Sequence, residues 1–272
     1  LSGITLHNSE GLKKFKYSLV DKDLKNTLIE FEKINKDRST IWNEYSEKSN
    51  INFINNDNKK VLILGDSLSK DLFIASSINK NISNYQFRRV KFDDNCLKNF
   101  DFKTNSSKNQ RCDFEITQLI NSILLKKSDI IIIANDWREN AKHLESFLNL
   151  DILISKKIII YKTHAFMDMS SFLIFKSHSK TNFKLNNIEE FTFTNRHHRT
   201  LKSHIVLNKI ADKFNLKTIN SFDFFCNDKL DRCNIFDENN IPLISDQTHL
   251  TNIGFIKFSP WFYKQLEKAI SF

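Results

Sequence analysis

The apolar residues of this chain fall into short runs, separated by longer stretches of mixed apolar and polar positions. The runs at 61–64, 130–133 and 158–160 are rich in isoleucine, leucine and valine, which is typical of strands buried on both faces. Segments 85–92 and 216–219 predict two further strands. Amphipathic helices are predicted at 68–78, 114–125, 140–150, 200–214 and 252–270. This alternation predicts an α/β fold: a three-layer α/β/α sandwich around a central, mostly parallel five-stranded sheet.

The first 57 residues have a different pattern. From Leu19 to Ile34 apolar residues recur at steps of three and four with charges between them, and Trp42 and Tyr45 continue the stripe. The asparagine-rich segment 50–58 then interrupts this pattern. We therefore expect residues 1–57 to form a helical extension or linker and residues 58–272 to form the main domain.

Composition and charge exclude some classes of protein. With 40% hydrophobic and 27% charged residues among 272, the chain can bury a core. The formal net charge of +9 permits a nucleic acid, an anionic lipid or an acidic glycan as partner. Lysine and arginine are scattered, as on an ordinary soluble surface. No zinc-finger spacing and no RNP-like aromatic motif is found, so we expect no nucleic-acid partner.

The chain contains no predicted membrane span, because its longest apolar run has only five residues, Ile130 to Ala134. Its first residues show no secretory signal. Since the first residue is Leu1 rather than Met, we expect the chain to be a piece of a longer protein.

The first candidate for chemistry is Gly65-Asp66-Ser67-Leu68, directly after the first predicted strand. In an open α/β sheet ligands bind beyond the carboxyl ends of the strands, so the Ser67 hydroxyl would face that crevice. Its backbone N–H, at a helix N-terminus, would point toward developing negative charge. Only four glycines occur in the chain, and Gly65 would permit the sharp turn. On these residues alone, Asp66 and Ser67 could equally be helix caps.

The second candidate is Asp246-Gln-Thr-His249, just before the last predicted helix. A serine nucleophile needs a base, and the base needs a carboxylate to orient it. Among the eight histidines, only His249 has an acidic residue three positions earlier. The segment alone could also be a surface turn that caps the last helix.

The third candidate is Asn135, at the end of the strand predicted at 130–133. Its side-chain N–H could donate to an oxyanion. The pair Asn135-Asp136 is also a common way to end a strand with a turn.

Together the three segments supply a nucleophile, a base, an orienting carboxylate and oxyanion donors, the set that acyl transfer needs. This constellation resembles the SGNH/GDSL hydrolase superfamily. The first block matches at Gly65-Asp66-Ser67-Leu68, and the last block matches at Asp246-x-x-His249 with Leu250 and Gly254. The resemblance implies a flavodoxin-like α/β/α fold. It also implies that Ser67 is the nucleophile, His249 the base and Asp246 its orienting partner, with Ser67 and Asn135 forming the oxyanion hole.

Two glycines of the family pattern are missing from this chain. Ile133-Ala134-Asn135-Asp136 matches the third block except for its glycine, and no glycine lies between positions 65 and 254 to supply the second block. One oxyanion donor would therefore come from a non-glycine backbone or be absent. We also expect Asp66, Asp136 and Trp137 to contribute to substrate binding.

A narrower resemblance is to the SGNH domain at the C-terminus of membrane acyltransferases of the acyltransferase-3 family. It rests on Cys226-x6-Cys233, on Asp246-x-x-His249 and on Trp137 soon after the third strand. These proteins O-acetylate cell-surface polysaccharides such as O-antigen. The resemblance implies a periplasmic or extracytoplasmic domain, attached to a membrane acyltransferase domain upstream of Leu1. That domain would deliver the acetyl group, and no cofactor is expected.

The four cysteines allow three pairings. Taken alone they could also be four reduced thiols, and none has the Cys-x-x-Cys spacing of a metal or redox site, so no metal is expected. The family resemblance favours disulfides, because extracytoplasmic compartments are oxidising. The pairs Cys96–Cys112 and Cys226–Cys233 close the short loops.

We therefore expect an O-acyltransferase, in particular an O-acetyltransferase, that modifies hydroxyls of a cell-surface polysaccharide through a Ser67 acyl-enzyme. One alternative is an SGNH carbohydrate esterase or deacetylase, in which the same triad passes the acyl group to water. The other is a non-catalytic glycan-contacting module, which the missing glycines would suit.

Overall fold

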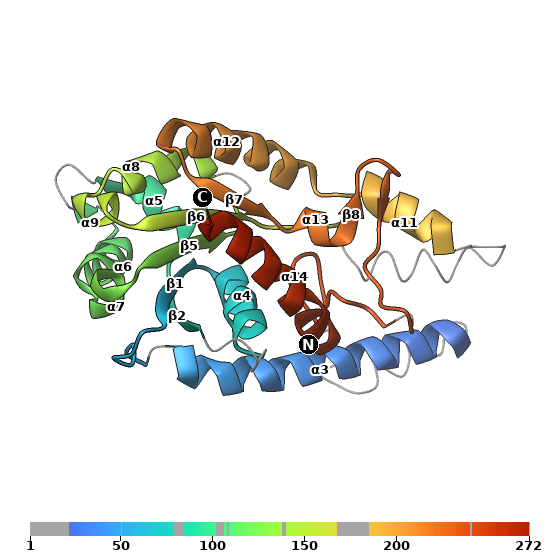
Figure 1. Cartoon of the computed structure of the whole chain (residues 1–272). Coiled ribbons are helices and arrows are strands. Elements are labelled where there is room, and N and C mark those ends of the chain that lie inside the picture. The colour runs from blue at the N-terminus through green and yellow to red at the C-terminus, as the bar shows by residue number, and fades with distance from the viewer. Residues whose placement is uncertain are drawn as a thin grey trace, which may run out of the picture.

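Five parallel strands form the central sheet of the computed structural model, which describes residues 22–49, 51–78, 84–101, 106–107, 109–137, 140–167, 185–239 and 241–271 (Figure 1). The strands are β1 (Lys59–Gly65), β2 (Tyr85–Lys91), β5 (Ile130–Asn135), β6 (Lys157–Lys162) and β7 (Lys217–Asn220). Their order across the sheet is β2-β1-β5-β6-β7. The predicted α/β/α sandwich is confirmed, and the central sheet is parallel throughout rather than mostly.

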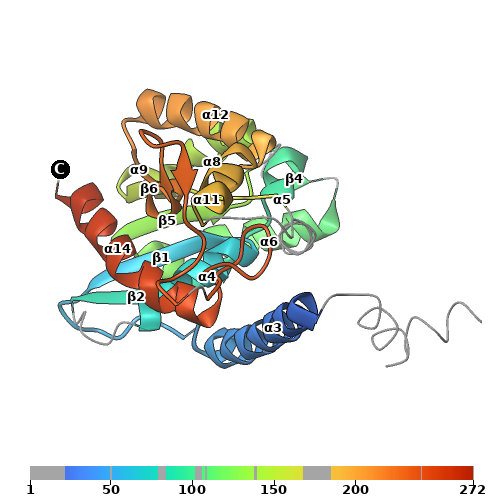
Figure 2. The same ribbon diagram turned by 90° about the vertical axis from the view of Figure 1, so that its right-hand side faces the viewer.

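Helices cover both faces of the sheet (Figures 1 and 2). One face carries α4 (Ser67–Ile78) and α14 (Asn252–Ile270), with the long α3 (Lys22–Ser49) beside them. The opposite face carries α6 (Gln110–Asn121), α7 (Ile123–Lys127), α8 (Leu144–Leu148) and α12 (His198–Phe214). The shorter elements are α5 (Asp94–Asn99), η1 (Ala141–His143), α9 (Asp151–Ile154), α11 (Leu185–Thr194), α13 (Phe222–Phe225), and the pairs β3 (Phe100–Asp101) with β4 (Ser106–Ser107) and β8 (Cys226–Asn227) with β9 (Arg232–Cys233).

The strand sequences follow from this double cover. Along β5, Ile130, Ile132 and Ala134 enter the core under α4 and α14. Ile131 and Ile133 enter the core under α6 and α12. Because successive strand side chains point to opposite faces, a strand covered on both sides must be apolar at every position. The unbroken apolar run at 130–134 therefore identifies a central strand, and β5 lies third of the five.

The helix predicted at 114–125 is interrupted in the structure. α6 ends at Asn121, and Ser122 adopts an extended backbone conformation. The Ser122 hydroxyl then accepts a hydrogen bond from the Leu125 N–H at 3.1 Å and caps the separate helix α7. An N-cap serine in the middle of an apolar periodicity is easily overlooked, because the periodicity continues across it. The helix predicted at 140–150 is likewise shorter in the structure, where the 3₁₀ turn η1 leads into the short helix α8.

Helix α3 lies within the region expected as an extension, and it packs on the main domain. Ile41 and Tyr45 are half-buried against the core under α4 and α14. Residues 1–21 and 50 of that region lie outside the described residues. The division of the chain at residue 57 stays a prediction. Within the described ranges, no helix combines the length and the hydropathy that crossing a membrane requires.

Both expected disulfides are present in the structure. Cys96–Cys112 joins α5 to α6 across a separation of 16 residues. Cys226–Cys233 joins β8 to β9 across a separation of 7 residues. The disulfides that the family resemblance favoured, paired so as to close the two short loops, are therefore confirmed.

The two bridges should differ in their effect on stability, since the longer loop restricts the unfolded chain more. Replacing Cys96 and Cys112 together by alanine should lower the free energy of unfolding by about 3 kcal/mol. The matched replacement of Cys226 and Cys233 should lower it by about 2 kcal/mol. Urea unfolding of the two double variants beside the parent chain measures both values. A larger loss for the shorter loop would contradict this explanation.

Candidate active site

The order of the strands fixes where a ligand can bind. The chain passes from β1 to β2 on one side, and then crosses to β5 on the other side of β1. At such a change of direction the loops that follow two neighbouring strands separate and leave a crevice beyond their carboxyl ends. The loop after β1 contains Asp66 and Ser67, and β5 ends at Asn135. Two of the three segments singled out in the sequence therefore meet at this point.

Gly65 allows these two segments to approach closely. Its φ of +150° is a conformation that side chains disfavour. A Cβ atom built on Gly65 would lie 1.8 Å from the carbonyl oxygen of Ala134 and 2.8 Å from Oδ1 of Asn135. Only glycine fits at this position, because the backbone of β5 occupies the space of any side chain.

Two side chains connect the approaching segments. Oδ1 of Asn135 accepts a hydrogen bond from the Asp66 N–H at 2.7 Å. Oδ2 of Asp66 accepts one from the Asp136 N–H at 2.9 Å, and its Oδ1 accepts one from the Leu68 N–H at 2.8 Å. Burial raises the pKa of Asp66, and the two backbone N–H groups oppose that rise. Asp66 therefore caps α4 and fixes the neighbouring loop, and both of its oxygens are used by the protein rather than offered to a substrate.

The amide nitrogen of Asn135 is left over by this arrangement. Asn135 is fully buried, and its Nδ2 has no hydrogen-bond partner among the residues that the structure describes. A buried amide donor without a partner is costly, so such a group is expected to serve a ligand or a transient charge. Because Oδ1 is held by Asp66, the direction of Nδ2 is fixed as well.

Ser67 is the first residue of α4, and its side chain is exposed. The first N–H groups of a helix have no partner within the helix and carry the positive end of its dipole. Ser67 therefore places both its hydroxyl and its backbone N–H at the mouth of the crevice. This position suits a nucleophile whose own backbone stabilises the charge that it creates.

The third segment is a tight turn built around Asp246. Oδ1 of Asp246 accepts hydrogen bonds from the N–H groups of Thr248 at 2.8 Å and His249 at 2.9 Å. The Ser245 N–H closes the turn by donating to the His249 carbonyl at 2.7 Å. The other carboxylate oxygen, Oδ2, lies 2.7 Å from Nδ1 of His249. One aspartate therefore shapes the loop and orients the imidazole.

The structure brings Ser67, His249 and Asp246 into one chain of hydrogen bonds. Nε2 of His249 lies 3.0 Å from Oγ of Ser67, a residue 182 positions away in sequence. An ionised carboxylate can only accept, so Nδ1 of His249 carries the hydrogen and donates it to Asp246. Nε2 is then left to accept a hydrogen bond from the Ser67 hydroxyl. These are the contacts that a serine nucleophile, a base and an orienting acid require.

The charges around His249 favour its protonated form. Burial lowers the pKa of His249, but the hydrogen bond to Asp246 and the nearby charge of Asp71 outweigh burial and raise it overall. For Asp246, burial acts against ionisation, and the hydrogen bonds from His249 and the backbone hold its pKa below the ordinary range. The pair therefore stores a proton on the imidazole more easily than a free histidine would.

Trp137 has a different place from the one expected. Its side chain is 1% exposed and packs in the core under α6 and α12. Its Nε1–H donates to the Tyr161 carbonyl at 3.2 Å. The indole therefore supports the end of β5 from inside the protein, and the expected contact with substrate does not fit this structure. Asp136 is half-buried beside it and donates its backbone N–H to Asp66.

Sequence reasoning missed two residues that lie against the triad. Asp71 is buried on α4, and Trp42 of α3 makes an edge contact with the His249 ring at 5.4 Å between centroids. Asp71 could have been found, because it lies four residues after Ser67 and so on the same face of the helix. No sequence signal connects Trp42 with His249, which lies more than two hundred positions away.

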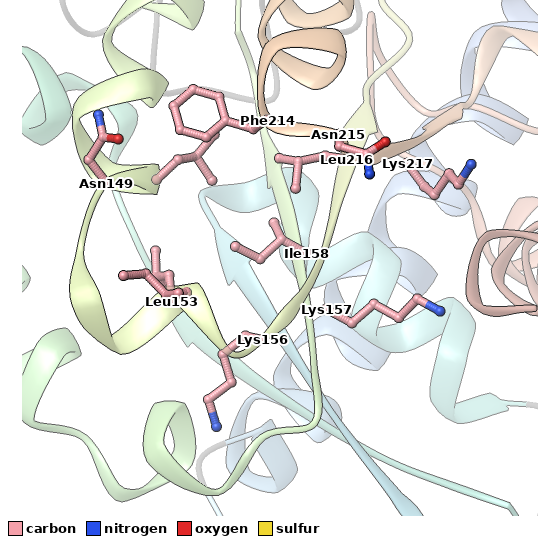
Figure 3. A pocket seen from close by; sticks show the side chains of 11 residues that line it. Asn149, Leu153, Lys156, Lys157, Ile158, Phe214, Asn215, Leu216 and Lys217 are labelled. Carbon is pink, nitrogen blue, oxygen red and sulfur yellow. The ribbon is translucent and has the colours of Figure 1, made fainter. Parts of the chain in front are cut away.

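A pocket of about 600 Å³ lies elsewhere, at the amino end of β6 and β7 (Figure 3). Phe214, Leu153 and Ile158 are among its apolar lining residues. The amino groups of Lys156 and Lys157 donate to backbone carbonyls instead of pointing into the pocket. The pocket contains none of the three triad residues, so it is separate from the candidate active site.

Comparison with known proteins gives a family match. A family model described as an SGNH domain fused to AT3 domains matches residues 35–264. The periplasmic domain of a lipopolysaccharide acetyltransferase from Salmonella ser. Paratyphi A has a TM-score of 0.56 and 15% identity, covering 78% of this chain and 85% of that one. This likeness supports the α/β/α fold. No curated protein sequence matches significantly.

Two esterase structures are more distant. A carbohydrate acetylesterase from Sinorhizobium meliloti has a TM-score of 0.44 and 12% identity, covering 78% of this chain and 99% of that one. An acetyl xylan esterase has a TM-score of 0.41 and 13% identity, covering 75% of this chain and 98% of that one.

The contact between His249 and Asp246 generates a prediction about titration. The pKa of His249 should lie above the ordinary histidine value, since the carboxylate stabilises the imidazolium. Replacing Asp246 by asparagine should lower that pKa, and the histidine should then lose its proton at a lower pH. NMR titration of the imidazole signals, assigned through their loss in His249→Gln, measures the effect. Asp93→Asn, at the N-cap of α5, is the control, and an equal shift there would contradict the assignment.

Proposed function

Because the chain belongs to the family of SGNH domains that are fused to AT3 domains, we propose that it is an O-acyltransferase domain that acetylates hydroxyls of a cell-surface polysaccharide. The observation that carries this proposal is the hydrogen-bonded chain from Ser67 through His249 to Asp246. These three residues lie at the crevice where the strand order changes direction, which is the position at which this type of sheet binds ligands.

In the first half-reaction, His249 takes the proton from the Ser67 hydroxyl through Nε2. The Ser67 oxygen then attacks the carbonyl carbon of the acyl donor and forms a tetrahedral intermediate. Asp246 keeps the imidazole in the required tautomer and stabilises the positive charge that it acquires. When the intermediate collapses, His249 gives its proton to the leaving group, and the acyl group stays on Ser67 as an ester.

The negative charge of the tetrahedral intermediate needs donors that are already oriented. The backbone N–H of Ser67 and the Nδ2 group of Asn135 would supply them. Asn135 suits this role because its Nδ2 is buried without a partner, while its Oδ1 is fixed by the Asp66 N–H. A donor that is fixed beforehand needs no reorganisation when the charge develops, and this makes it effective.

In the second half-reaction, a sugar hydroxyl gives its proton to His249 and attacks the acyl-Ser67 carbonyl. The Ser67 oxygen leaves, recovers the proton from His249, and the sugar carries the new ester. Ser67 is exposed, so a polymeric acceptor could reach the acyl-enzyme from solvent. The similarity to a periplasmic lipopolysaccharide acetyltransferase domain supports a polysaccharide as acceptor.

The acyl donor and the location of the domain follow from the family. In a chain whose relatives are fused to AT3 domains, a membrane acyltransferase domain would deliver the acetyl group to Ser67. The domain would then lie in the periplasm or in another extracytoplasmic space, attached through a region upstream of Leu1. The two disulfides agree with an oxidising compartment.

A carbohydrate esterase is the second candidate. The same exposure that admits a sugar hydroxyl to Ser67 also admits water. If water attacks the acyl-enzyme, the products are acetate and free Ser67. Transfer and hydrolysis therefore differ only in the acceptor that reaches the ester first.

The nucleophile can be tested with a fluorophosphonate probe. The parent chain should form a covalent adduct at Ser67, whereas Ser67→Ala should form none, because the replacement removes the attacking hydroxyl. Ser77→Ala is the control, since Ser77 lies on the same helix with its hydroxyl bonded to the Phe73 carbonyl. Mass spectrometry of peptides locates the adduct. Absence of labelling in the parent chain would instead favour a non-catalytic glycan-contacting module.

The acceptor is tested by incubating the chain with 4-nitrophenyl acetate and with purified O-antigen polysaccharide. Transfer predicts that O-acetylated polysaccharide forms and that free acetate decreases when the polysaccharide is added. Ser67→Ala should produce neither acetylated polysaccharide nor free acetate. Release of acetate alone, at a rate that the polysaccharide does not change, would identify an esterase.

The oxyanion role of Asn135 predicts a loss of turnover in a chain that still folds. Replacing Asn135 by aspartate keeps an oxygen that can accept from the Asp66 N–H, removes the Nδ2 donor and adds a buried carboxyl group, whose negative charge would repel an oxyanion. Loss of one such donor lowers kcat by about 10²–10³. Kinetics with 4-nitrophenyl acetate and a thermal melt measure the two quantities. An Asn135→Asp variant with the parent kcat would contradict this role.

A further inference from the structure

A buried carboxylate lies behind the histidine of the triad. Asp71 is on α4, four residues after Ser67, and is 4% exposed. Its Oδ2 accepts a hydrogen bond from the Leu250 N–H at 2.8 Å, and Leu250 directly follows His249. Its Oδ1 accepts one from Nε1–H of Trp42 at 2.8 Å. One side chain therefore links the nucleophile helix, the histidine loop and α3.

The charge state of Asp71 follows from its partners. Both carboxylate oxygens accept from N–H donors, as an ionised carboxylate does. Burial raises the pKa of Asp71, and the charges of His249 and Arg38, the Leu250 N–H and the Trp42 N–H oppose that rise. A buried charge contributes little to stability compared with an apolar side chain of the same size. Its effect on neighbouring groups is therefore the more informative property.

Helix α3 presents one polar stripe toward this carboxylate. Arg38, Trp42 and Ser46 are spaced by four residues and so lie on one face of the helix. Two cations lie over the Trp42 ring, Arg38 at 4.2 Å and Lys70 of α4 at 4.4 Å from the ring centroid. The Arg38 Nη2 is 3.9 Å from Oδ1 of Asp71, and Lys70 donates to the Ser46 hydroxyl.

The same stripe reaches the triad itself. The indole of Trp42 meets the imidazole of His249 at an interplanar angle of 82°, an edge-to-face contact. Trp42 packs against the core under α4 and α14 together with Ile41 and Tyr45 of the same helix. α3 therefore docks on this core and, through Arg38 and Trp42, also contacts Asp71 and His249.

We propose that Asp71 is a positioning residue for acyl transfer, and that α3 completes the active site by holding Asp71 and His249 through Arg38 and Trp42. This inference rests on the proposed function. Asp71 fixes the backbone beside His249, so that Nε2 stays within reach of the Ser67 hydroxyl. Trp42 fixes Asp71 and limits the movement of the imidazole ring. The region upstream of the main domain is then a part of the catalytic unit.

The proposal has an electrostatic consequence that packing alone would not produce. The charged and titratable groups that surround His249 come from five segments of the chain: Asp246, Asp71, Asp66, His164 and Arg38. The negative charge of Asp71 raises the pKa of His249, and the positive charge of Arg38 lowers it. Removing the two charges one at a time should therefore shift the histidine titration in opposite directions.

The test uses the whole chain with the single replacements Asp71→Asn, Arg38→Gln and Trp42→Phe. NMR titration of the imidazole should give a lower His249 pKa in Asp71→Asn and a higher one in Arg38→Gln. Fluorophosphonate labelling of Ser67 at neutral pH should slow by about ten- to a hundredfold in Asp71→Asn and Trp42→Phe, because small displacements of a catalytic group have effects of this size. Circular dichroism verifies the fold.

Matched controls separate positioning from general damage. Trp261→Phe alters an indole of α14 that packs against Phe258 and Phe224. Arg111→Gln removes an exposed guanidinium that pairs with Glu115. Neither should change the titration or the labelling rate. Unchanged titration and labelling in a folded Asp71→Asn variant, or shifts of the same sign in Asp71→Asn and Arg38→Gln, would overturn the proposal.

A failure of the proposed function can be distinguished from a failure of this inference. If the parent chain is not labelled at Ser67, the proposed function fails, while the NMR titration still tests the coupling to His249. If Asp71→Asn does not fold, Arg38→Gln and Trp42→Phe carry the same test from α3. The proposal would then be overturned if the His249 pKa in Arg38→Gln and the labelling rate of Ser67 in Trp42→Phe both equalled those of the parent chain.

Discussion

The close approach of the β1–α4 turn to the end of β5 is the constraint on which the rest of the site depends. It exists because Gly65 has no side chain: a Cβ there would lie 1.8 Å from the Ala134 carbonyl oxygen. At this separation the Asp66 N–H reaches Oδ1 of Asn135, and that bond fixes the orientation of the amide. The same turn starts α4 at Ser67. The absence of one side chain thus sets the directions of both Ser67 and the Asn135 amide.

Sequence patterns predicted the layers of the fold, and they singled out Ser67, His249 and Asp246, which the structure brings within hydrogen-bond distance of one another. Buried parallel strands must be apolar on both faces, so their runs were visible, and the residues after them were the ones that a parallel sheet brings together. The patterns were insufficient for Trp137. An aromatic residue after a strand can point to a ligand or into the core, and sequence does not distinguish the two. Packing decided for the core, where Trp137 donates to the Tyr161 carbonyl.

The contacts of α3 were hidden for another reason. Helical periodicity identifies the face that is buried, but it does not identify the partner of each residue on that face. Trp42 was recognised only as part of an apolar stripe, whereas its Nε1–H and its ring edge have separate partners, Asp71 and His249. Sequence treats an extension and a domain as separate segments. Where an extension carries polar groups among its buried positions, its contacts with the domain can be functional as well as structural.

Three aspartates connect the loops of this site in the same way. Asp66, Asp71 and Asp246 each accept at least one backbone N–H from a loop that would otherwise be free to move. Carboxylates suit this purpose because two oxygens can join two segments with strong, charge-assisted bonds. Of the three, only Asp246 also accepts from an imidazole nitrogen, and its side chain is 47% exposed. Its carboxylate can therefore stabilise a positive charge on His249. The two more buried aspartates hold the segments that carry the reacting groups. The three side chains are chemically identical. Whether an aspartate orients the imidazole or only holds a loop therefore depends on which donors its oxygens accept from.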